Sequence, residues 1–152
     1  MTSVEYDIAT LEQVPMLRVL GRGILRMIAL GAETRQVHTG EMLFVPNEKP
    51  DCAFVVQSGM FALSMDPENS QRVIEAGPGS MLGEFALLTE SARPFSAIAQ
   101  QPSTVMRISR SMFMKILEND ADAAVRLRDY VARRTRMSIA EMLTVKESFG
   151  LK

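Results

Sequence analysis

The first part of the chain carries apolar residues at helical spacing. Between Leu17 and Leu30 they recur every three or four positions, which is typical of a helix with one buried face. Gly21 and Gly23 weaken this pattern and predict a break before the main helix, and Gly31 predicts its end. The pattern therefore predicts a helical segment that ends near Gly31.

The residues ahead of this helix are harder to assign. We expect residues 1–9 to form a loose lead-in. Thr10 has a side chain suited to capping a helix, so we expect a short helical turn from Thr10 to Val14. Pro15 would end this turn, because proline lacks the amide that continues a helix.

From Glu33 onward the period of the apolar positions changes to two, which predicts strands. Clusters of Gly, Pro, Asn, Asp and Ser separate the strands, and short strands at such regular spacing indicate a sandwich or a barrel. The expected strands are at Val37, Met42–Val45, Ala53–Gln57, Met60–Met65, Arg72–Ala76, Phe95–Ala99 and Thr104–Ser109.

The last third returns to helical spacing. Ser109 is placed to cap a helix over Met112–Glu118. A longer helix follows from about Asp120 to about Lys146, with apolar residues spaced along it and many arginines between them. We therefore expect a β-structure flanked by helices on both sides in sequence.

Composition narrows the class of protein. A length of 152 residues suits one domain, and a net charge of −1 gives no overall electrostatic attraction to nucleic acid or membrane. The single cysteine, Cys52, has no intrachain partner for a disulfide, and no stretch is long and apolar enough to span a membrane. Because the N-terminus also lacks a signal-peptide pattern, we expect a cytoplasmic location.

The sequence offers little for catalysis. The sole histidine, His38, has no cluster of cysteines or carboxylates around it, so we expect no metal site and no cofactor. There is no serine–histidine–acid constellation and no phosphate-binding loop with its lysine. We therefore expect a protein that is not an enzyme.

The candidate chemistry lies between Gly77 and Ala97. Glycines and a proline open this stretch, and a short apolar run after Glu84 predicts one helical turn whose first amides have no intrahelical partner. Arg93 follows with a permanent cation and a planar fork of donors. Amides and a guanidinium suit a phosphate, and a carboxylate suits neighbouring hydroxyls, so the combination indicates a nucleotide. Taken singly, Glu84 also fits a first-turn acidic residue, and Arg93 also fits a partner of a surface carboxylate.

These residues resemble the phosphate-binding cassette of cyclic nucleotide-binding domains, as found in the catabolite activator protein, the regulatory subunit of protein kinase A and cyclic-nucleotide-gated channels. The family pattern is roughly F-G-E-x-A-L-x-x-x-x-P-R-x-A-T-V. The matching positions are Leu82-Gly83-Glu84-Phe85-Ala86-Leu87-Leu88 and Ala92-Arg93-Pro94-Phe95-Ser96-Ala97. We call residues 82–97 the cassette.

The resemblance implies a fold and a division of the chain. The fold is mostly β with flanking helices: a jelly-roll β-barrel with N-terminal helices and two C-terminal helices. Residues 1–152 would form a single domain, with a helical lead-in at 1–31, the barrel with its cassette at 32–109 and the C-terminal helices at 110–152.

The resemblance also implies roles for individual residues. Glu84 would accept a hydrogen bond from the ribose 2′-hydroxyl, Arg93 would pair with the exocyclic oxygens of the cyclic phosphate, and the backbone amide of Ala86 would donate to the same phosphate. The candidate ligand-binding residues are Gly83, Glu84, Phe85, Ala86, Arg93, Pro94 and Ser96.

The cassette departs from the family pattern around the arginine. Pro94 follows Arg93 where the family usually offers a backbone amide to the phosphate, and proline has no such donor. Ala92 replaces the usual proline, and Phe95 stands where a small residue is usual and would crowd or line the site. We therefore expect weakened or altered binding, with loss of binding as the alternative.

The expected function is that of a stand-alone module that binds and senses a cyclic nucleotide and signals through its C-terminal helix. We expect cyclic AMP over cyclic GMP, since no hydroxyl follows Arg93. Candidates for contacting the base from this helix are Tyr130, Arg133, Arg134 and Arg136. The alternative is a degenerate domain that binds no ligand and acts in protein interaction or dimerisation.

Partners follow from the same resemblance. We expect an unidentified protein partner or a homodimer formed through the C-terminal helix. The transcription factors of this family add a helix-turn-helix after that helix, whereas this sequence stops at Lys152, so we expect no DNA binding. We also expect no membrane contact, because the net charge is near zero and no apolar stretch is long enough to span a bilayer.

Overall fold

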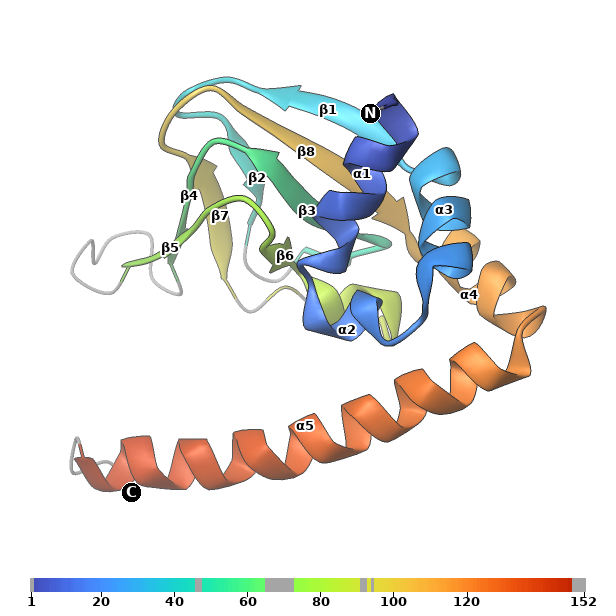
Figure 1. The fold of residues 1–152 in the computed structure, drawn as a ribbon. Coiled ribbons are helices and arrows are strands. Elements are labelled where there is room, and N and C mark those ends of the chain that lie inside the picture. The colour runs from blue at the N-terminus through green and yellow to red at the C-terminus, as the bar shows by residue number, and fades with distance from the viewer. Residues whose placement is uncertain (1, 46–47, 65–72, 91–92, 94, 149–152) are drawn as a thin grey trace.

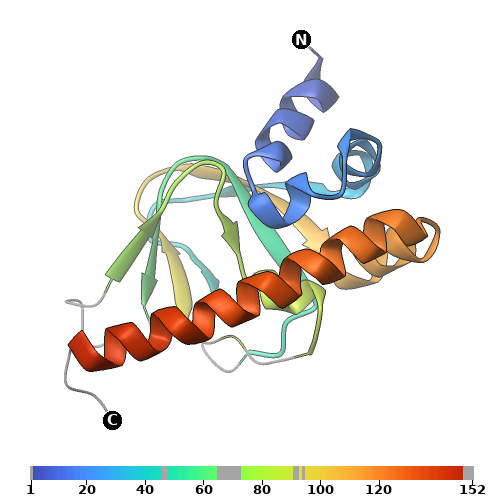
Figure 2. The same ribbon diagram turned by 60° about the horizontal axis from the view of Figure 1, so that its bottom comes forward.

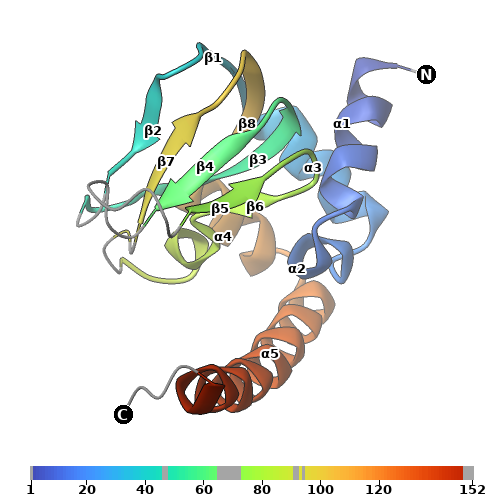
Figure 3. The same ribbon diagram turned by 90° about the vertical axis from the view of Figure 1, so that its left-hand side faces the viewer.

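The computed structural model describes residues 2–45, 48–64, 73–90, 93 and 95–148, with side chains as far as residue 134. Two antiparallel sheets of four strands each face one another (Figures 1 and 3). The helices before and after the strands lie outside this pair of sheets (Figure 1). This arrangement confirms the predicted class, a jelly roll with flanking helices, although the barrel is not closed.

The order of strands mixes early and late parts of the chain. The first sheet has the order β1-β8-β3-β6, and the second has the order β2-β7-β4-β5. The strands are β1 (Glu33–Val37), β2 (Met42–Phe44), β3 (Cys52–Ser58), β4 (Phe61–Ser64), β5 (Val73–Ala76), β6 (Met81–Leu82), β7 (Ser96–Ala99) and β8 (Ser103–Ser109). The sequence pattern predicted each of them except β6, which lies between the predicted turn and the cassette helix.

The N-terminal helices are α1 (Ser3–Glu12), α2 (Pro15–Arg18) and α3 (Arg22–Gly31). The predicted break is confirmed, because Gly21 sits between α2 and α3 at a φ of +89°, a conformation that glycine adopts without strain.

The prediction of a loose lead-in at residues 1–9 is wrong. The side chain of Thr2 accepts a hydrogen bond from the Glu5 amide at 3.1 Å, and the Glu5 carboxylate accepts one from the Thr2 amide at 3.2 Å. This capping box starts α1 and satisfies two amides that a helix end leaves free. Thr10 is consequently no cap: it lies buried inside α1, and its hydroxyl donates to the Tyr6 carbonyl.

The strands contribute side chains to two apolar cores. Along β3, Ala53 and Val55 face a core formed with the helices, whereas Phe54 and Val56 face a core between the sheets. This alternation follows from the period of two in a strand, and it explains why β3 is apolar on both faces. We refer to these as the helical core and the inter-sheet core.

The C-terminal helices are α4 (Arg110–Glu118) and α5 (Ala121–Ser148). The Ser109 hydroxyl accepts from the Met112 amide at 3.2 Å, so the predicted cap is confirmed. In Figures 1 and 2, α5 leaves the end of α4 and runs along the side of the molecule on which the cassette helix lies. None of the helices described is both long and apolar enough to cross a bilayer.

Candidate functional site

The cassette begins where β6 leaves the first sheet. Gly83 has a φ of +74° and caps a short 3₁₀-helix, η1 (Glu84–Leu87). The Ala86 amide donates to the Gly83 carbonyl at 3.0 Å, which closes the turn. Among the described residues, the amides of Glu84 and Phe85 have no backbone acceptor. The start of η1 therefore presents two free donors beside Gly83, as a helix start is expected to do.

Arg93 is buried next to this turn. Its side chain is only 4% exposed, and its Nη2 donates to the Cys52 carbonyl at 2.9 Å. Its Nε and Nη1 are buried without a hydrogen-bond partner. Nη1 lies beside Gly83, close enough that a Cβ at residue 83 would overlap it. One side of the guanidinium is thus anchored to the protein, and the other side offers unused donors at the cassette turn.

The anchored guanidinium lies on aromatic rings. Its central carbon is 4.3 Å from the ring centroid of Phe44 and 5.8 Å from that of Phe54. Rings in this position attract a cation through their quadrupole. Phe95 packs 5.8 Å from Phe44, centroid to centroid, and belongs to the surroundings of the inter-sheet core. Phe95 therefore packs against one of the two rings on which Arg93 lies.

Arg93 has no carboxylate partner among the described residues. Burial raises the pKa of the Cys52 thiol, 3.7 Å from Nη2, so this neighbour stays uncharged. A buried cation without a counter-ion is costly, because burial removes it from water. The site is thus electrostatically prepared for an anion.

Glu84 stands at the first position of η1 and is half-buried. Burial raises the pKa of its carboxyl, and the charge of Arg134 on α5 opposes this rise. No described residue donates a hydrogen bond to this carboxylate or forms an ion pair with it. The cassette thus carries an unused acceptor in Glu84 and unused donors in Arg93.

The remaining predicted site residues have different surroundings. Phe85 is 62% exposed, and Ala86 is buried. Ser96 is fully buried in β7, and its hydroxyl donates to the Ser64 carbonyl at 3.2 Å, so only its lone pairs remain for a ligand. Pro94 lies outside the described residues.

The candidates on α5 for contacting the base differ in their burial. Tyr130 is half-buried and packs against the helical core. Arg133 and Arg134 are exposed, and the positive charge of Arg134 lowers the pKa of the Glu84 carboxyl. The side chain of Arg136 lies outside the part described.

Sequence reasoning missed three residues that build the site. The Cys52 carbonyl and the Phe44 ring hold Arg93, and Arg110 of α4 donates to carbonyls at the end of η1. Nothing in the local sequence indicates these contacts, because the partners lie 41 positions apart in the first case and 24 in the last.

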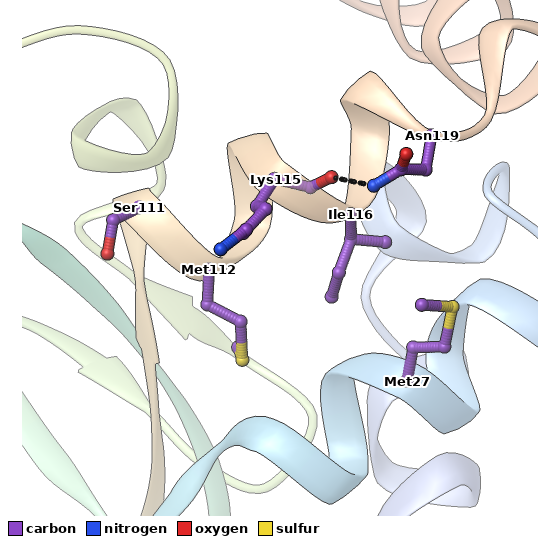
Figure 4. Close-up of a pocket in the computed structure, with 6 residues that line it drawn as sticks. All are labelled: Met27, Ser111, Met112, Lys115, Ile116 and Asn119. Atoms are coloured by element: carbon purple, nitrogen blue, oxygen red, sulfur yellow. Dashed lines mark hydrogen bonds between the residues drawn. The ribbon is translucent and has the colours of Figure 1, made fainter.

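A separate hollow lies between α3 and α4, away from the cassette. It encloses about 490 Å³ and is lined by Met27, Ser111, Met112, Lys115, Ile116 and Asn119. Figure 4 shows Met27, Met112 and Ile116 extending into the space between the two helices. None of the predicted site residues contributes to it. In the described part of the chain, no group of three or more His, Cys, Asp or Glu could hold a metal ion.

Comparison with known proteins relates this arrangement to one family. The family model described as "Cyclic nucleotide-binding domain" matches residues 34–120, which is more than half of the chain. A cyclic nucleotide-binding-like protein from Brucella abortus is 36% identical in a structural match that covers 74% of this chain and 97% of that one, with a TM-score of 0.66. The catabolite activator protein of Thermus thermophilus, at 22% identity and a TM-score of 0.71, covers 87% of this chain and 63% of its own and shows the shared fold.

Sequence relatives are much longer proteins. Lysophospholipase NTE1 of Phaeosphaeria nodorum is 24% identical over 140 residues, which are 91% of this chain and 9% of that protein. The nte1 lysophospholipase of Neosartorya fischeri is 26% identical over 143 residues, again 9% of its length. The chain thus spans about a tenth of the lysophospholipases it matches.

Proposed function

Because the chain belongs to the cyclic nucleotide-binding domain family, a family of regulatory modules, we propose that it binds a cyclic nucleotide at the cassette and acts as a sensor rather than an enzyme. The proposal rests on the burial of Arg93 and on its missing hydrogen-bond partners. Arg93 is a buried cation with two unused donors and no carboxylate partner among the described residues. A cyclic phosphate monoanion supplies both the charge and the acceptors that this group lacks.

The other cassette groups complete the ligand. The free amides of Glu84 and Phe85 lie at the start of η1, where they add donors for phosphate oxygens. The Ala86 amide already serves the Gly83 carbonyl, so its predicted bond to phosphate requires that it be shared or released. The Glu84 carboxylate, an acceptor only, would take the ribose 2′-hydroxyl.

The signal would leave through α5. The charge of Arg134 on α5 acts on the Glu84 carboxyl, so we expect a nucleotide held by Glu84 and Arg93 also to meet α5. A ligand that contacts α5 in one position only favours that position by its differential affinity. The helix would then be read by a protein partner or by a second copy of the chain. We place this module in the cytoplasm, where a free cysteine such as Cys52 is usual.

The preference for cyclic AMP rests on the residue after Arg93, where Pro94 offers no hydroxyl for a guanine base. Three features support the alternative, a domain that binds no ligand and acts in protein interaction. The Ala86 amide and the Ser96 hydroxyl already have internal partners, and proline removes one phosphate donor.

Calorimetric titration of the nucleotide-stripped protein with cyclic AMP and cyclic GMP separates these functions. We expect saturable binding in the micromolar range or tighter, with cyclic AMP the stronger ligand. No heat with either nucleotide, together with a melting temperature that millimolar ligand does not raise, would support the interaction domain instead.

Replacing Glu84 with glutamine tests the contact to the ribose. We expect Glu84→Gln to weaken cyclic AMP binding about tenfold, because a charge-assisted bond of about 1.5–3 kcal/mol is replaced by a neutral one. The affinity for 2′-deoxy cyclic AMP should not change, since that ligand lacks the hydroxyl. Equal losses for both nucleotides would contradict the assignment.

Because the pKa of Glu84 is raised, the wild type and Glu84→Gln should differ in how their nucleotide affinity depends on pH. Because burial raises this pKa above its usual 4.5, the wild-type carboxylate takes up its proton at a higher pH than an ordinary glutamate. The affinity of the wild type should therefore fall on acidification before pH reaches 4.5, while that of Glu84→Gln stays level.

The raised pKa of Glu84 also affects stability. The folded protein holds the proton of the Glu84 carboxyl more tightly than the unfolded chain, so ionisation of Glu84 lowers the stability as pH rises. Glu84→Gln should accordingly melt slightly higher at neutral pH.

A further inference from the structure

We propose that Arg110 is the positioning residue that couples the cassette to the C-terminal helices. This inference rests on the proposed function, because it assigns the route by which an occupied nucleotide site would change the position of α4 and α5. Of the candidate ligand-binding residues, Arg110 contacts only the carbonyl of Ala86, so it would act through the backbone of η1.

Arg110 holds two separate parts of the chain with one nitrogen. Its Nη1 donates to the Thr89 carbonyl at 2.8 Å, to the Ala86 carbonyl at 2.9 Å and to the Pro50 carbonyl at 3.1 Å. Ala86 lies in the last turn of η1 and Thr89 two residues beyond its end, and Pro50 lies just before β3. The carbonyls that end a helix lack intrahelical partners, and a cation is a favourable partner for them.

The remaining contacts hold the tip of this side chain and the backbone of Arg110. Nη2 lies 3.9 Å from the Glu90 carboxylate, and the Arg110 amide donates to the Asp51 carbonyl at 2.8 Å. The side chain is only 22% exposed. Arg110 therefore spans from the first residue of α4 to the cassette on one side and to the start of β3 on the other.

A shift of the cassette would reach α5 through this link. α4 packs into the helical core through Phe113, Ile116 and Leu117, and α5 joins the same core through Ala123 and Leu127. A ligand that pulls on the start of η1 displaces the carbonyls at its end, because η1 is only four residues long. These carbonyls bind the first residue of α4, so α4 follows and carries the base of α5 with it.

The geometry requires arginine rather than any cation. The three carbonyls share the two N–H groups of Nη1, and Nη2 faces the Glu90 carboxylate, whereas a lysine side chain is one bond shorter and carries a single nitrogen. We therefore expect Arg110→Lys to retain the charge and lose most of the coupling.

Hydrogen exchange with and without cyclic AMP tests the link. In the wild type, saturating nucleotide should slow exchange in residues 84–89 of the cassette and in α4 and the first half of α5 (residues 110–134). In Arg110→Gln, the cassette should still be protected at saturation, while the protection of residues 110–134 should fall to less than half. Its affinity should drop about tenfold, because the ligand no longer gains from the helical contacts.

The matched control is Arg107→Gln. Arg107 on the adjacent β8 has a similar exposure of 27% and pairs with Asp51 and Glu33, but it has no hydrogen bond to the cassette. Nucleotide protection of residues 110–134 should survive this substitution. If saturated Arg110→Gln shows the wild-type protection of these residues, the proposed coupling is overturned.

The ligand-free proteins separate this inference from the proposed function. If the wild type binds no nucleotide, the function fails, but loss of Arg110 should still speed exchange in residues 84–89 and 110–118 together, about fivefold relative to Arg107→Gln. Unchanged exchange in both segments would overturn the link itself. Should Arg110→Gln not fold, Arg110→Lys is measured in its place under the same criteria.

Discussion

Arg93→Ala should lower the affinity for cyclic AMP by about 100-fold. The two unused donors of Arg93 would each form a charge-assisted hydrogen bond with the phosphate, worth about 1.5 kcal/mol or more, and about 1.4 kcal/mol corresponds to a factor of ten. Alanine removes both bonds and the positive charge that attracts the ligand. The loss is measured by titration calorimetry on the stripped protein.

The stability of the variant must be followed alongside its affinity. Arg93 also donates to the Cys52 carbonyl and lies on the Phe44 ring, so its loss affects the folded state as well. Arg107→Ala is the matched control, because it removes the same charge from β8, the strand that pairs with β3 and its Cys52. If Arg93→Ala stays folded and binds cyclic AMP as tightly as the wild type, Arg93 does not hold the phosphate.

Gly83→Ala should abolish binding through geometry rather than charge. A Cβ at this position would overlap Nη1 of Arg93. The guanidinium would therefore have to move away from its position between Gly83 and the Phe44 ring. Alanine is also strained at a φ of +74°, at a cost of about 1–2 kcal/mol. We expect a loss of affinity at least as large as that of Arg93→Ala, since the donors and the turn are both displaced.

Gly40→Ala isolates the backbone strain in this experiment. Gly40 has a similar φ of +83°, but a Cβ there would meet no atom within 4 Å. Both variants should lose a similar amount of stability from strain, measured by chemical unfolding, and only Gly83→Ala should lose nucleotide affinity. If the two variants bind equally well, the close approach of Arg93 to Gly83 has no role in binding.

Much of the fold follows from local patterns. The alternating segments became strands of two sheets, and Ser109 and Gly21 mark the start of α4 and the break before α3 as predicted. The prediction of a loose lead-in at residues 1–9 was wrong because the reciprocal hydrogen bonds of Thr2 and Glu5 start α1 earlier than the apolar spacing indicates. The short strand β6 escaped prediction because its pairing with β3 is decided by a strand distant in sequence.

The sequence by itself determined the family and the two charged groups of the candidate site, because Glu84 and Arg93 lie in one short segment at the spacing of the cassette. Only the tertiary structure decided how these groups are held. The Cys52 carbonyl and the Phe44 ring come from other strands, and Arg110 comes from a helix that starts after the last strand. The physical reason is that burial of a cation and the direction of its hydrogen bonds depend on which distant segments pack around it. The spacing of residues along one segment therefore does not predict which distant segments pack around it.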